Sequence, residues 1–181
     1  MRVKISFGFC AMICVMAWVN TRVCIYFLIS AAVHELGHFC ALKLCRVPVD
    51  GISLKLTGAV LQTVFHDEQS ELFCAAAGPV ASAILGALCL RWEAELAVIS
   101  FLLAAVNLLP LFPLDGGRIL RAFLRLHCSE QCAEKILRIM TFTVCSILML
   151  LACWGTIYLQ AGIWPIFAAL VLLWRAGSAE K

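Results

Sequence analysis

The sequence has few charged residues for its length. Only 14% of its 181 residues are Asp, Glu, Lys or Arg, whereas 64% are hydrophobic and the mean hydropathy is +0.99. Soluble domains carry about 25% charged residues, so this composition excludes an ordinary water-facing surface. The sequence also contains no internal repeat, low-complexity tract or polar linker. We therefore expect one integral membrane domain over residues 1–181, with no soluble C-terminal domain in this chain.

The 11 cysteines lack the spacing of a metal site or a disulfide framework. No CxxC pair occurs, and most of these residues lie within apolar runs. Buried cysteine packs as a small apolar residue, and the odd total agrees with free thiols. His127, Cys128 and Cys132 offer only three ligands at one turn, too few for a closed structural zinc site. We expect free thiols.

Long apolar runs make up most of the chain. A membrane-spanning helix needs about 20 apolar residues, and the first and last runs are short for this length. An N-terminal signal peptide is the alternative for the first run, but no small-x-small cleavage site follows, which favours a retained anchor. The predicted fold is an all-α polytopic membrane protein with about six transmembrane helices, at residues 5–19, 23–44, 72–90, 96–113, 139–159 and 163–174.

The distribution of basic residues predicts the orientation in the membrane. With six spans and a cytoplasmic N-terminus, only Arg22 and Arg91 of the 14 basic residues would lie outside. Basic residues favour the cytoplasmic side, so both termini are expected in the cytoplasm, and the membrane is expected to be of the bacterial cytoplasmic type. The net charge of +3 reflects this bias and does not indicate a nucleic-acid partner.

Two segments between the spans have a different pattern. Residues 52–64 alternate apolar and polar positions and are rich in strand formers, which predicts a short β-hairpin between the second and third spans. Such a strand pair cannot face lipid, because its edge groups would lack hydrogen-bond partners. Residues 115–138 are the most charged part of the chain and predict one or two amphipathic cytoplasmic helices.

Ionisable residues within the spans form one cluster in the segment "AAVHELGHFCA", residues 31–41. His34 and His38 lie one helical turn apart, so both imidazoles can reach one ion. Glu35 lies on the flank of the same face, where a carboxylate can act as a general base. This HExxH pattern is typical of zinc hydrolases. Structural core histidines are the alternative, but burying three ionisable groups in a membrane without a function is costly.

Two histidines leave a zinc ion short of a third protein ligand. Asp115 is the only carboxylate between Glu95 and Glu130, and it follows the fourth span in "NLLPLFPLDGGR". Pro110 and Pro113 break the helix there, and Gly116 and Gly117 permit unusual dihedral angles. We predict that Asp115 completes a site for one zinc ion.

Three motifs in this order resemble those of site-2 protease-type intramembrane zinc metalloproteases. They are "HELGH" in the second span, "AAGP" at residues 76–79 and "NLLPLFPLDGG" at the end of the fourth span, within residues 30–118. The arrangement is similar to the bacterial subgroup of the stage IV sporulation protein FB. The resemblance implies zinc binding by His34, His38 and Asp115, catalysis by Glu35, and a role for Asn107 in positioning the substrate or stabilising the oxyanion. It does not name the substrate-binding residues.

The expected function is hydrolysis of a peptide bond in or near the membrane segment of a protein substrate. The resemblance implies a sporulation sigma factor precursor as one candidate substrate, and membrane proteins as regulatory partners. A zinc-binding membrane transporter is the alternative, but its polar ligands should extend across the bilayer, and the outer halves of these spans are almost wholly apolar. A non-catalytic scaffold would not require Glu35.

Overall fold

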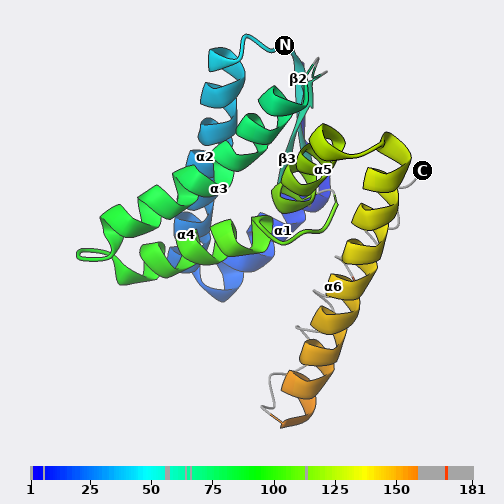
Figure 1. Cartoon of the computed structure of the whole chain (residues 1–181). Helices are drawn as coiled ribbons and strands as arrows, with labels where there is room; N and C mark the ends of the chain where they lie inside the picture. The colour runs from blue at the N-terminus through cyan, green and yellow to red at the C-terminus, as the bar shows by residue number, and fades with distance from the viewer. Residues whose placement is uncertain are drawn as a thin grey trace. The chain divides into compact units, whose positions relative to one another are not determined.

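A computed structural model describes residues 2–5, 7–55, 58–63, 65, 67–112, 114–158 and 170. The chain divides into two compact units, Met1–Asn107 and Leu108–Lys181. In the part of the chain described, the first unit has four helices and a three-stranded sheet, and the second has two helices (Figure 1).

Among the described residues, three helices are long and apolar enough to cross a membrane, namely α2 (Thr21–Leu44), α3 (Glu68–Cys89) and α6 (Glu130–Tyr158). They contain the second, third and fifth predicted spans. The helices α1 (Phe7–Val19) and α4 (Ala94–Asn107) have only 13 and 14 residues. At 1.5 Å per residue each is about 20 Å long, shorter than the hydrocarbon core of a bilayer.

The predicted limits of three spans need correction or remain outside the description. Ile5, expected at the start of the first span, belongs to a β-strand. The fourth helix ends at Asn107 rather than at residue 113, because the residue before Pro110 is disfavoured in a helix. The sixth predicted span, residues 163–174, lies outside the described residues except for position 170.

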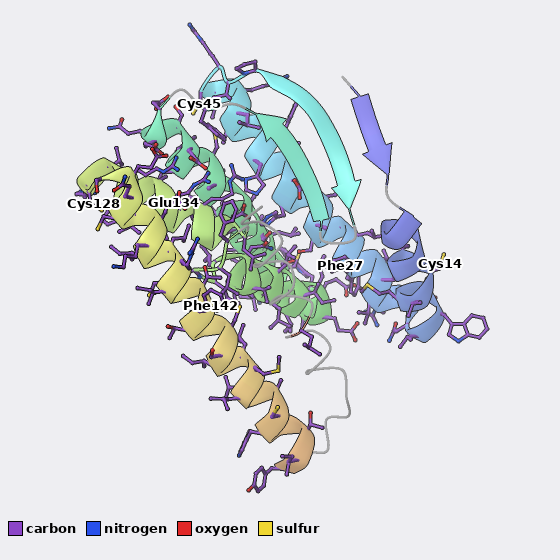
Figure 2. All side chains as sticks on the ribbon, turned by 90° about the vertical axis from the view of Figure 1, so that its right-hand side faces the viewer. Cys14, Phe27, Cys45, Cys128, Glu134 and Phe142 are labelled. Carbon is purple, nitrogen blue, oxygen red and sulfur yellow. The ribbon has the colours of Figure 1, made fainter. Side chains whose placement is uncertain are left out.

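Three strands form one sheet in the order β1 (Arg2–Ile5), β2 (Val49–Lys55) and β3 (Gly58–Thr63). The strands β2 and β3 lie where the sequence predicts a strand pair, and they pair antiparallel with Lys55 opposite Gly58. The strand β1 runs parallel to β2 on its other side, so β2 is the central strand (Figure 2). The strand β1 was not predicted, because it has only four residues and its partner strand is distant in the chain.

The helices α2 and α3 are held in close contact by a glycine. A Cβ atom on Gly37 would lie 2.6 Å from the Ala77 carbonyl oxygen and 2.7 Å from the Ala81 Cβ, so no larger residue fits there. Beyond this contact, Ala41 and Leu42 of α2 pack with Cys74 of α3 in a small buried cluster. The backbone of α3 therefore approaches α2 closely at Gly37.

Polar side chains join the start of α2 to the turn between α3 and α4. The Tyr26 hydroxyl donates to Glu93 Oε2 at 2.7 Å, and Arg22 Nη2 donates to the same oxygen at 3.1 Å. Arg22 Nε also lies 3.3 Å from Glu95 Oε2. Both segments therefore lie at one end of this unit.

The second unit consists of α5 (Asp115–His127) and α6, which meet at a sharp turn (Figure 1). The charged segment at residues 115–138 thus forms α5 and the first turns of α6. Arg125 on α5 binds Glu130 at 2.9 Å and Glu134 at 2.8 Å, which fixes this turn. Cys128 and Glu134, which are labelled in Figure 2, lie at this turn and in the first turns of α6. All the cysteines that the structure describes in full are free thiols, as predicted.

The Tyr26–Glu93 contact predicts how stability depends on pH. The Tyr26 hydroxyl, together with Arg22, lowers the pKa of Glu93, a residue of the turn outside the spanning helices. A carboxylate whose pKa is lowered by folding stabilises the fold above its unfolded-state pKa of about 4.3, and this contribution is lost as the pH falls through the folded-state pKa. Glu93→Gln should therefore lower the melting temperature more near pH 7 than near pH 3, in thermal scans of the detergent-solubilised protein. An equal difference at both pH values would contradict this account.

Candidate metal and catalytic site

His34 and His38 face each other on α2, one helical turn apart. Their Nε2 atoms are 3.2 Å apart, and the rings meet edge to face with centroids separated by 4.8 Å. Both residues are buried, with exposed fractions of 5% and 7%. The spacing of the HExxH pattern therefore brings two imidazole nitrogens to one point, as the sequence predicts.

The helix α3 holds the far side of each ring. His38 Nδ1 lies 2.8 Å from the carbonyl oxygen of Cys74, and His34 Nδ1 lies 3.0 Å from the hydroxyl of Ser82. A carbonyl oxygen can only accept a hydrogen bond, so His38 carries its proton on Nδ1 when neutral. Its Nε2 then presents a lone pair toward His34. Fixing the tautomer through the remote nitrogen is typical of metal-binding histidines.

Gly78 provides the space that the two rings occupy. A Cβ atom at this position would overlap the ring of His38 and would lie 2.9 Å from His34 Nε2. Gly78 belongs to the "AAGP" motif, and Pro79, the next residue, is fully buried inside α3. The motif therefore places a residue without a side chain opposite the histidine pair.

The histidine pair fits a tetrahedral zinc ion. Two nitrogens bound at 2.0–2.1 Å in tetrahedral geometry lie about 3.3 Å apart, close to the 3.2 Å observed between the Nε2 atoms. Neutral imidazole is also a ligand that zinc prefers. Glu35, the next residue after His34, is half-buried beside this face rather than buried within it. That position suits a base that handles protons better than it suits a ligand.

Asp115 is the first residue of α5, in the second unit. It is buried, with an exposed fraction of 8%, and its Oδ1 lies 3.7 Å from Arg118 Nη1. Gly116 and Gly117 are both helical and neither has a positive φ, so the unusual dihedral angles that glycine permits do not occur here. They are needed for space instead. A Cβ atom on Gly116 would overlap the Leu108 carbonyl, and one on Gly117 would lie 2.5 Å from the Leu111 carbonyl oxygen.

Asn107 is the last residue of α4 and is half-buried. Its Nδ2 donates to the Leu103 carbonyl oxygen at 2.9 Å, which fixes the orientation of the amide. An amide nitrogen carries two hydrogens, so one remains for another acceptor. The role suggested for Asn107 in oxyanion stabilisation stays a prediction.

Ser82 and the carbonyl of Cys74 were not predicted from the sequence, because neither group ionises like a carboxylate or an imidazole. The signal that could have revealed Ser82 is its position four residues after Gly78, which puts both on one face of α3. The carbonyl of Cys74, a backbone group, leaves no such signal.

Gly78→Ala should abolish high-affinity zinc binding, because the added methyl group would displace both imidazole rings. Gly155→Ala in α6 is the matched control, since a Cβ atom there would meet nothing within 4 Å. Zinc content after dialysis against a weak chelator, measured by atomic emission on the purified proteins, checks this. Zinc retained by Gly78→Ala at the wild-type level would show that the ion does not bind at the histidine pair.

The sequence and the fold are similar to those of known proteins. The model described as Peptidase family M50 matches residues 91–151. "Zinc metalloprotease MJ0392" of Methanocaldococcus jannaschii is 34% identical over 109 residues, a match that covers 53% of this chain and 32% of that relative. The chain thus matches about a third of the length of this curated relative.

A solved structure described as "Site-2 Protease from Methanocaldococcus jannaschii" superposes with a TM-score of 0.74 at 26% identity, covering 99% of this chain and 90% of the other. The match to the M50 model extends from the end of α3 into α6 and includes Asp115, whereas HExxH lies on α2. The structural likeness covers nearly the whole chain and so includes the segments of both motifs that carry site residues. In sequence and fold the chain is similar to zinc metalloproteases of the site-2 protease type, and its residues 91–151 match the Peptidase family M50 model.

Proposed function

We propose that this chain is an intramembrane zinc metalloprotease that hydrolyses a peptide bond in or near the membrane segment of a protein substrate. The observation that carries the proposal is the histidine pair, whose Nε2 atoms lie 3.2 Å apart while α3 holds both Nδ1 atoms. A single zinc ion would be held by His34, His38 and Asp115. These three residues are buried, and each offers one ligand atom.

Bound zinc supplies Lewis-acid chemistry, which polarises a carbonyl and lowers the pKa of water toward about 7. Glu35 takes the proton of the attacking water and later delivers it to the leaving amine. The free N–H of the Asn107 amide donates to the oxygen that becomes negative during attack. The apolar surroundings keep bulk water away and strengthen these interactions.

The substrate has to unwind before it can be cut, because the peptide bonds of a membrane helix are shielded and hydrogen-bonded within the helix. Pairing with a strand replaces the lost hydrogen bonds. Among the described strands, β2 is paired on both sides and β1 and β3 on one side each, and β3 is the longer of the two edge strands, with six residues against four. We therefore place the extended substrate along β3, within the segment that the sequence predicts as the hairpin.

The substrate is proposed to be a membrane-associated protein. The resemblance of the motifs to the stage IV sporulation protein FB subgroup supports a sporulation sigma factor precursor, processed under the control of other membrane proteins. The strong bias of basic residues toward one side supports a multi-pass protein in a bacterial cytoplasmic-type membrane, with both termini in the cytoplasm. Water and substrate would then enter from the cytoplasmic side.

Glu35→Gln tests the proposed reaction. The amide has the shape of the carboxylate but cannot accept the proton, so cleavage should fall at least about a hundredfold while zinc stays bound. The measurement is co-expression with a sigma factor precursor or another membrane-tethered candidate, followed by immunoblotting for the processed product. Glu130→Gln is the matched control, because that side chain is 74% exposed at the start of α6. Equal processing by wild type and Glu35→Gln would overturn the proposal, and so would loss of zinc from Glu35→Gln.

A further inference from the structure

We propose that Ser82 is a positioning residue that accepts a hydrogen bond from Nδ1 of His34 and so keeps Nε2 of that ring available to the metal ion. The inference rests on the proposed function, since it assigns a role at the same site. It adds a residue that lies outside the three sequence motifs. The evidence is the burial of Ser82, its 3.0 Å contact with His34, and the tautomer of the neighbouring His38.

The Ser82 hydroxyl differs from comparable hydroxyl groups in these helices. Ser100 on α4 is also fully buried, but its hydroxyl donates to the Leu96 carbonyl oxygen of its own helix at 2.8 Å. Ser146 makes the same local bond to Phe142. This back-bonding is the common way to satisfy a hydroxyl in a membrane helix. Ser82, with an exposed fraction of 0%, instead reaches across to α2 and contacts an imidazole.

The tautomer of His34 decides whether the pair can bind a metal ion. The Cys74 carbonyl fixes the His38 proton on Nδ1, so His38 Nε2 is an acceptor. If His34 carried its proton on Nε2, that N–H would donate to His38 Nε2 at 3.2 Å, and this hydrogen bond would occupy both metal-binding nitrogens. With the proton on Nδ1, both lone pairs are directed to the same point. The metal-binding state therefore requires an acceptor for the Nδ1–H of His34.

Ser82 is that acceptor in an apolar environment. A buried N–H group without an acceptor carries a large desolvation cost. Removing the Ser82 hydroxyl would therefore destabilise the metal-binding tautomer of His34, which carries its proton on Nδ1. A serine oxygen can accept from Nδ1–H and can also donate to a bare Nδ1. It therefore satisfies the ring in either tautomer, whereas alanine satisfies neither. Loss of such an outer hydrogen bond to a metal-binding histidine typically weakens metal affinity 10–100-fold.

The test is zinc affinity, measured on the full-length protein in detergent by competition with a chromophoric chelator. Ser82→Ala should weaken zinc binding by about 10–100-fold. Ser82→Thr keeps the hydroxyl and should restore most of the affinity. In protein labelled with ¹⁵N-histidine, the Nδ1–H resonance of zinc-loaded His34 should shift in Ser82→Ala and stay close to its wild-type position in Ser82→Thr.

Two buried serines serve as matched controls. Ser100→Ala removes a buried hydroxyl bonded only within α4, and Ser30→Ala removes one on α2, one turn before His34, that has no hydrogen-bond partner in the described structure. Both should keep zinc affinity within about threefold of wild type. Affinity unchanged in Ser82→Ala, or reduced equally in the two controls, would overturn the role of Ser82.

His34→Ala separates this inference from the proposed function. It should reduce zinc affinity more than Ser82→Ala does, because it removes a ligand rather than the group that orients one. If His34→Ala weakens zinc binding and Ser82→Ala does not, the positioning role fails while the zinc site stands. If His34→Ala leaves zinc affinity unchanged, the zinc site itself is wrong, and the role of Ser82 falls with it.

Discussion

The contact between α2 and α3 is the constraint on which the candidate site depends. Because Gly37 has no side chain, the backbone of α2 can pack against the Ala77 carbonyl of α3. Because Gly78 has no side chain, the two imidazole rings fit between the helices. This close packing of α2 and α3 lets groups of α3 contact the Nδ1 atom of each histidine. Small residues thus serve two purposes here: they pack the helices tightly, as in many membrane proteins, and they set the distance for the hydrogen bonds.

The apolar environment makes each polar contact at this site consequential. A polar group buried without a partner is costly in a membrane, and the histidine rings satisfy their Nδ1 atoms through a backbone carbonyl and a hydroxyl rather than through charged groups. Neutral partners on Nδ1 leave Nε2 as the reactive nitrogen without adding net charge to the interior. The same environment favours Glu35 at the edge of the site, half-buried, where it can exchange protons with water.

The sequence predicted the local chemistry better than the limits of the helices. HExxH placed His34 and His38 together because the spacing of a helix is fixed, and the run of β-forming residues predicted strands where β2 and β3 occur. It did not predict β1, whose pairing depends on a segment nearly fifty residues away. It overestimated the fourth helix, because apolar composition continues through Pro110 although the helix does not. It did not reveal why Gly116 and Gly117 are needed, because the lack of space at this helix start arises from packing against Leu108 and Leu111.

The central proposal, which rests on the sequence motifs, is that Asp115 is a zinc ligand together with His34 and His38. Zinc-edge X-ray absorption on wild type and on Asp115→Cys tests it most directly, because a zinc–sulfur distance of about 2.3 Å is readily distinguished from zinc–nitrogen and zinc–oxygen distances of about 2.0–2.2 Å. We predict no sulfur around zinc in the wild type, despite its 11 cysteines, and one sulfur in Asp115→Cys. Sulfur in the wild type, or none in zinc-loaded Asp115→Cys, would contradict the account.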